Sequence, residues 1–85
     1  MLQSQQPPAL RRDPRETTLA LLAARAPGAT VCPSEVARAL ADEWRSAMPA
    51  VHAAVDRLVE EGLVGLSWKG QPLAARSGPY RIAHP

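Results

Sequence analysis

Apolar residues recur at helical spacing in three stretches of the chain. The first stretch begins with Asp13, a favourable N-cap residue, followed by Pro14 at the first helical position and by Glu16. This signature predicts a helix from Pro14 to Ala26, where a Pro-Gly pair turns the chain. One face of the helix is apolar and comprises Thr18, Leu19, Leu22 and Ala26, widened by Leu21.

The second stretch, PSEVARAL, predicts a helix over Pro33–Leu40. Proline suits its first position, and Glu35 lies near the positive end of the helix dipole. The inward face is expected to comprise Val36, Ala37, Leu40 and Ala41. The short segment Thr30–Cys32 before this helix favours an extended conformation.

The third stretch contains Pro49, which a helix tolerates in its first turn, where the backbone N–H would have no partner. We therefore predict a helix from Ala47 to Glu61, with Ser46 as its N-cap and Gly62 as its C-cap. Its apolar stripe follows a spacing of three and four residues and comprises Met48, Val51, Val55, Leu58 and Val59.

After the third helix the apolar period changes to two. Val64, Leu66 and Trp68 alternate with Leu63, Gly65 and Ser67, which predicts a strand. The following Lys69–Pro72 has the composition of a turn, and Tyr80–Ile82 alternates again as a returning strand. The pattern therefore predicts an antiparallel hairpin at the end of the chain.

The order of these elements predicts a fold of the mainly α class. It is a winged helix, in which a three-helix core containing a helix-turn-helix pair is closed by an antiparallel hairpin, the wing. The domain is expected to span residues 12–83. Residues 1–11 are rich in Gln and Pro and are expected to form a disordered lead-in.

Composition restricts the class of protein. A chain of 85 residues allows one small domain, and its single cysteine allows no internal disulfide. No apolar run approaches the roughly 18 residues of a membrane helix, and no leader-like apolar segment follows Met1. We therefore expect a soluble, cytoplasmic protein that does not bind a membrane.

Several segments resemble a known family. These are CPSEVARAL, the segment MPAV that begins at Met48, and WKGQP and GPYRI in the predicted wing. From Arg12 to about Ala83 the chain resembles a family of small bacterial winged-helix-like proteins whose function is unknown. The resemblance supports the fold and carries over no catalytic residue. More distantly, SEVARAL and RLVEEGLV are similar to winged-helix transcriptional regulators, in which the third helix enters the major groove of DNA.

The formal charge of +2 is unevenly distributed along the chain. Residues 26–62 carry three arginines against six acids, whereas residues 63–85 carry three basic residues and no acid. Two outward positions of the third helix are acidic, Asp56 and Glu60, and would repel phosphate. Candidate nucleic-acid contacts are Arg45 and Ser46 at the start of the third helix, His52 and Arg57 on its flanks, and Lys69, Arg76 and Arg81 on or beside the wing. The Arg11-Arg12 pair before the first helix is a further basic segment.

No motif indicates catalysis or a cofactor. Cys32, His52 and His84 are too far apart in the sequence for the usual paired spacing of zinc ligands, so no metal site is expected. The chain contains no phosphate-binding Gly-Lys-Ser/Thr sequence and no nucleophile elbow. We therefore expect a protein that is not an enzyme and holds no cofactor.

Two functions from different classes remain open. The first is a nucleic-acid-binding module for double-stranded DNA, in which the third helix and the basic wing make the contacts. The second is a protein-interaction module, in which the Ala-rich third helix or Trp44 contacts another chain. An apolar edge through Leu21 would also allow a homodimer. Trp44 and Trp68 are both expected to pack against the core, although Trp68 is also placed to stack on a base.

Overall fold

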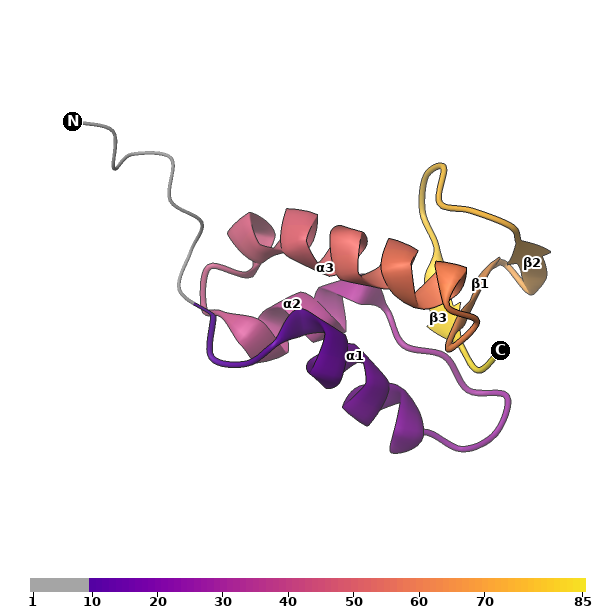
Figure 1. The fold of residues 1–85 in the computed structure, drawn as a ribbon, viewed down its shortest axis with the longest axis horizontal. Coiled ribbons are helices and arrows are strands. Elements are labelled where there is room, and N and C mark those ends of the chain that lie inside the picture. The colour runs from indigo at the N-terminus through magenta and orange to yellow at the C-terminus, as the bar shows by residue number, and fades with distance from the viewer. Residues whose placement is uncertain (1–9) are drawn as a thin grey trace.

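The computed structural model describes residues 10–85. Three helices, α1 (Pro14–Ala23), α2 (Pro33–Leu40) and α3 (Trp44–Glu60), precede three strands. The strands are β1 (Gly65–Trp68), β2 (Gln71–Leu73) and β3 (Arg81–Ala83), and they form one antiparallel sheet in the order β2-β1-β3. Figure 1 shows the helices packed together and the sheet beside the C-terminal end of α3. This arrangement confirms the winged-helix-like fold.

A single hydrophobic core joins the helices to the sheet. Every α-helix and the strands β1 and β3 contribute side chains to it. The buried apolar residues are Leu22, Val31, Val36, Ala37, Leu40, Ala41, Ala47, Val51, Val55, Leu58, Val64, Leu66, Tyr80 and Ile82. The apolar faces predicted for α2 and α3 are confirmed, except that Met48 and Val59 are only partly buried and Ala47 is fully buried.

Helix α1 begins as predicted and ends three residues early. The Asp13 side chain accepts a hydrogen bond from the Arg15 backbone N–H at 3.1 Å, and Pro14 occupies the first helical position. The helix ends at Ala23, and the Arg25 N–H then bonds the Leu22 carbonyl at 3.1 Å, a tighter spacing than in an α-helix. The prediction that Ala26 belongs to the buried face is therefore wrong, and this residue is exposed.

Helix α3 begins three residues earlier than predicted, at Trp44, with Glu43 in the N-cap position. Ser46 is thus not the cap but lies in the first turn, and its N–H bonds the Glu43 carbonyl at 3.0 Å. Pro49 therefore lies inside the helix and leaves the Arg45 carbonyl without its usual donor. Trp44, in the first turn, packs partly against the core.

Helix α3 ends one residue before the predicted position, and the predicted glycine cap is confirmed. Gly62 adopts a left-handed backbone conformation with φ of 75°. Its N–H bonds the Val59 carbonyl at 3.0 Å, and the Leu63 N–H bonds the Leu58 carbonyl at 3.0 Å. This pair of hydrogen bonds is the Schellman motif, which satisfies the last carbonyls of the helix and turns the chain into β1.

The predicted hairpin is confirmed, with Leu66 of β1 opposite Ile82 of β3. The structure adds the short strand β2 where a turn and loop were predicted. A two-residue turn, Lys69-Gly70, joins β1 to β2, and both residues have positive φ, 51° and 79°. Such a turn matches the twist of paired strands, so the chain can pair again at once. Pro72 is tolerated because β2 is an edge strand.

The extended segment before α2 also joins the sheet. Val31 forms a single antiparallel bridge with Ile82, in which each N–H bonds the other carbonyl at 2.8 Å. This bridge confirms the extended conformation that the sequence predicts for Thr30–Cys32. It brings the start of α2 next to β3 and to the residues that precede β3.

The chain already packs from Leu10, which contacts the core, and the Arg11 N–H bonds the Leu40 carbonyl at 2.9 Å. The Arg11 side chain also pairs with Asp42. Most of the predicted disordered lead-in, residues 1–9, lies outside the described residues. Within residues 10–85, no helix is long and apolar enough to span a membrane.

Two neighbouring threonines of α1 provide a test of hydrogen bonding in the core. Both are buried, but the Thr18 hydroxyl donates to the Pro14 carbonyl at 2.8 Å, whereas the Thr17 hydroxyl has no partner among the described residues. We expect Thr17→Val to stabilise the protein by about 1 kcal/mol, because it removes an unsatisfied buried polar group at equal side-chain shape. We expect Thr18→Val to destabilise it by a similar amount.

Urea unfolding of both variants would measure the two changes, and valine and threonine have similar helix propensities. Equal effects of the two substitutions would show that the Thr17 hydroxyl finds a partner in solution.

Candidate nucleic-acid interface

The exposed side of α3 carries two of the predicted cationic contacts. The buried stripe of α3 points into the core, which leaves Arg45, Ser46 and Arg57 exposed on the rest of the helix. Neither arginine forms an ion pair with any acid of residues 10–85. The Arg45 guanidinium lies 4.4 Å from the centre of the Trp44 ring, and that of Arg38 lies 4.6 Å from it. These contacts orient the two arginines and leave their charge available.

Trp44 itself packs partly against the core, as expected. Its ring forms a base for the two guanidiniums at the beginning of α3. A cation over an indole face is attracted by about 0.5–1 kcal/mol at an exposed site. The sequence predicts Trp44 as a core residue or as an anchor for a protein partner, and only the structure shows it as a support for Arg45.

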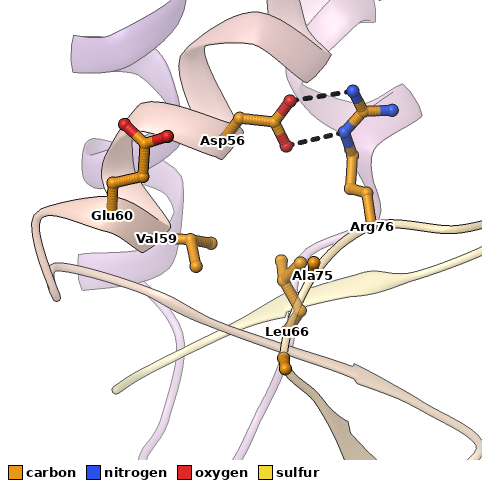
Figure 2. A pocket seen from close by; sticks show the side chains of 7 residues that line it. Asp56, Val59, Glu60, Leu66, Ala75 and Arg76 are labelled. Atoms are coloured by element: carbon orange, nitrogen blue, oxygen red, sulfur yellow. Dashed lines mark hydrogen bonds and ion pairs between the residues drawn. The ribbon is translucent and has the colours of Figure 1, made fainter.

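An ion pair joins α3 to the wing loop, the segment between β2 and β3. The Arg76 Nε and Nη2 atoms donate to the two carboxylate oxygens of Asp56, each at 2.8 Å (Figure 2). The hydrogen bonds from Arg76 lower the pKa of Asp56 more than burial raises it, and those same bonds raise the pKa of Arg76. The pair has two consequences. It neutralises one of the two acids on the outer side of α3, and it occupies a predicted phosphate contact.

A small open pocket lies beside this ion pair. It has a volume of about 290 Å³, and apart from the pair its wall consists of aliphatic side chains and of Glu60. In Figure 2, Glu60 lies on the side of the pocket away from Arg76, and Val59, Leu66 and Ala75 lie between them. This wall presents one uncompensated acid and no free cation among the described residues, so it does not suit phosphate.

His52 is hydrogen-bonded to the only tyrosine of the chain. Its Nδ1 lies 2.7 Å from the Tyr80 hydroxyl, and the ring centres are 5.6 Å apart. Burial, and next the positive charge of Arg76, hold the pKa of His52 below its usual value, against the opposing charge of Asp56. Burial also raises the pKa of Tyr80 to about 12. His52 is therefore a neutral hydrogen-bonding group at pH 7 and supplies no positive charge.

The two remaining wing cations differ in their surroundings. Lys69 is exposed in the turn between β1 and β2. Arg81 is partly buried, and its Nε donates to the Thr30 hydroxyl at 2.5 Å. Of the seven predicted contacts, the structure therefore leaves Arg45, Ser46, Arg57 and Lys69 exposed, whereas His52, Arg76 and Arg81 each bond to another residue of this chain.

A second open pocket lies between the start of α2, the first half of α3 and the wing. It has a volume of about 380 Å³ and a mostly apolar wall, and we call it the aromatic pocket. Its lining residues are Cys32, Pro33, Ser34, Met48, His52, Trp68, Gly78, Pro79 and Tyr80. No sequence pattern brings these residues together, because they come from four segments that only the fold makes adjacent.

Trp68 is less buried than predicted. It is the last residue of β1, and 38% of it is exposed. Val64 and Leu66, on the same side of the chain, are buried, so the strand passes the edge of the core before it reaches Trp68. The indole therefore forms part of the pocket wall rather than part of the core.

The Cys32 thiol also lies on this wall, at the N-cap of α2. Its Sγ is 3.1 Å from the Ser34 hydroxyl. Burial would raise the pKa of the thiol, but the hydrogen bonds with Ser34 and the charge of Arg81 outweigh it and hold the pKa below its usual value. Within residues 10–85, no group of three or more His, Cys, Asp or Glu side chains could hold a metal ion.

Comparison with known proteins identifies a family. A family model described as protein of unknown function (DUF3253) matches residues 11–85. No curated protein matches the chain. The resemblance to an uncharacterised family is thereby confirmed, and that family supplies no activity to carry over to this surface.

The ion pair between the wing and α3 predicts a salt-dependent stability. Asp56→Asn should destabilise the protein by about 0.5–1 kcal/mol at low ionic strength and by less in high salt, because both partners are partly exposed. Because the pKa of Asp56 is lowered in the folded state, its contribution is present above pH 4 and is lost as the pH falls through that lowered value.

Urea unfolding at low and high salt, at neutral and acid pH, would measure this contribution. Glu60→Gln is a matched control, because Glu60 lies one turn further along α3 and forms no ion pair with the described residues. An equal loss of stability in both variants would contradict the assignment to the ion pair.

The burial of Tyr80 predicts an unusual alkaline titration. Ultraviolet absorbance reports tyrosinate from this residue alone, because the chain has one tyrosine. We expect a midpoint near pH 12 in the folded protein and near 10 in urea. Because the folded state holds this proton more tightly, stability is fully present below pH 10 and falls as the pH rises toward 12. A midpoint near 10 without urea would show that the phenol is accessible in the native state.

Proposed function

We propose that this chain, which belongs to the DUF3253 family of proteins of unknown function, is a nucleic-acid-binding module that uses α3 and the wing. One observation carries the proposal. Arg45, Arg57 and Lys69 are exposed, and none forms an ion pair with any acid of residues 10–85, whereas Asp56 on the same side is neutralised by Arg76. Exposed cations that have no ion-pair partner are free to neutralise phosphates.

The ion pairs of the molecule support this assignment. Four acids are held by arginines, in the pairs Arg11–Asp42, Arg15–Glu61, Arg25–Glu35 and Arg76–Asp56. Asp56 on α3 and Glu61 at its C-cap are compensated in this way, and Glu60 is not. The repulsion of phosphate that the sequence predicts from Asp56 is therefore removed.

The positions of the free cations also suit contact with the phosphate backbone of a nucleic acid. Arg45 lies in the first turn of α3, where Ser46 adds a hydroxyl and the helix dipole favours negative charge. Lys69 lies on the tip of the β1–β2 turn, and Arg57 lies three turns along α3. A nucleic acid that follows α3 can reach both arginines, while the wing supplies a third contact through Lys69.

A protein-interaction module is the second candidate function. Two large apolar residues, Leu63 and Trp68, are 42% and 38% exposed. Exposed aromatic residues are common anchors in protein interfaces. A protein partner would require neither Arg57 nor Lys69, and its binding would depend little on salt.

The two candidates differ in one measurement. We expect a fluorescent duplex of mixed sequence to bind with a micromolar dissociation constant that weakens steeply as salt rises. Arg45→Gln and Lys69→Gln should each weaken binding and lower the slope of log Kd against log salt by about 0.9, the value for one lost phosphate contact. Fluorescence anisotropy at several salt concentrations measures both quantities.

Arg12→Gln is the matched control, because Arg12 is exposed before α1 and belongs to neither α3 nor the wing. If all three variants lower the slope equally, the contacts are spread over the basic surface and not confined to α3 and the wing. The absence of duplex and single-strand binding at low salt would overturn the proposal and favour a protein partner.

A further inference from the structure

The aromatic pocket is bordered by two of the proposed nucleic-acid contacts, Arg45 and Lys69. Arg45, Met48 and His52 occupy positions i, i+3 and i+7 of α3 and therefore share one side of the helix. Met48 and His52 line the pocket, so Arg45 lies at its edge on the α3 side. On the wing side, Trp68 lines the pocket, and Lys69 follows it directly in the chain.

The charges around this pocket favour an anionic ligand. No acid is among the lining residues. The nearest acids in the sequence are Glu35, beside Ser34, and Asp56, one turn beyond His52, and each is paired with an arginine. An apolar space with a cation at either edge is therefore complementary to a ligand that combines a flat apolar group with flanking negative charges.

We propose that the aromatic pocket binds an unpaired nucleobase, stacked against Trp68, while the adjoining phosphates contact Arg45 and Lys69. This inference rests on the proposed function and specifies its ligand as nucleic acid with single-stranded character. Aromatic side chains bind bases in this way because every base has a π-face, whereas a cationic surface beside them follows the backbone. A base that remains stacked in a duplex cannot enter such a pocket.

The polar groups of the pocket agree with this ligand. His52 is held neutral, and its Nδ1 is bonded to the Tyr80 hydroxyl, which leaves Nε2 for the edge of a base. The Ser34 hydroxyl is the second such group on the wall. Neutral hydrogen-bonding groups suit the uncharged edge of a base, and the charged groups lie outside the pocket, where the phosphates pass.

The closing experiment compares single-stranded and double-stranded DNA on the same protein. The probes are an oligothymidine of about 12 nucleotides and a blunt duplex of mixed sequence. In a Trp44→Phe background, Trp68 is the only tryptophan and reports its own stacking by fluorescence. We expect the oligothymidine to quench Trp68 and the blunt duplex to leave it unchanged.

A second readout needs no variant. Cys32 is the only cysteine and lies on the pocket wall, so its rate of reaction with a thiol reagent reports access to the pocket in the natural sequence. We expect the oligothymidine to slow this reaction and the blunt duplex to have little effect.

Substitution then tests the role of the indole. Trp68→Leu should weaken binding of the oligothymidine at least about tenfold and leave duplex binding nearly unchanged, because it keeps an apolar side chain but removes the stacking surface. Leu63→Ala is the matched control, since Leu63 is equally exposed but does not line the pocket, and it should change neither affinity. Circular dichroism confirms that each variant is folded.

The outcomes separate the two proposals. Duplex binding together with unchanged Trp68 fluorescence and unchanged Cys32 reactivity would overturn the base pocket and leave the proposed function intact. Equal loss of duplex and single-strand affinity in Trp68→Leu would also overturn it. Binding of neither DNA at low salt would overturn both proposals.

Discussion

The paired backbone bonds between Val31 and Ile82 determine how the two halves of this molecule meet. Both residues are fully buried, and each bonds the other through its N–H and its carbonyl at 2.8 Å. They lie far apart in the sequence, so the bridge closes the segment that contains α2, α3, β1 and β2. Ile82 also faces Leu66 across the sheet. Because a strand shifted by one residue turns its side chains to the opposite face, this bridge fixes which residues of β3 enter the core.

The position of the aromatic pocket follows from the same bridge. Ile82 is held against Val31, and Tyr80 comes two residues before Ile82 in the chain. Tyr80 therefore lies beside His52 of α3, and Cys32, which follows Val31, lies close to the wing. The hydrogen bond between Tyr80 and His52 then connects the wing loop to α3 inside the structure, and the Arg76–Asp56 pair connects them at the surface. The wing is thus fixed against α3 by one partly buried and one exposed contact.

Arginine has two roles in this small protein. Four arginines pair with acids and join α1 to α3, α1 to the start of α2, the N-terminal segment to the end of α2, and the wing to α3. Exposed ion pairs of this kind contribute little to stability, because water and salt screen them. Their larger effect is electrostatic, because compensated acids no longer oppose the free cations. The charge that is free to attract a ligand therefore differs from the formal charge summed over each segment of the sequence.

The sequence determined the elements, because local rules govern them: the Asp13-Pro14 start of α1, the glycine cap after α3 and the alternation of β1 can each be identified from a few neighbouring residues. Two local rules do not hold in the structure, because α3 begins at Trp44, which packs against the core, and Pro49 therefore lies inside the helix. Only the tertiary structure decided which cations are free. The partners of an arginine lie far away in the sequence, as with Arg76 and Asp56, and no spacing rule connects residues on a wing and a helix. The same reason explains why the aromatic pocket was not predicted, because its wall exists only where four distant segments meet.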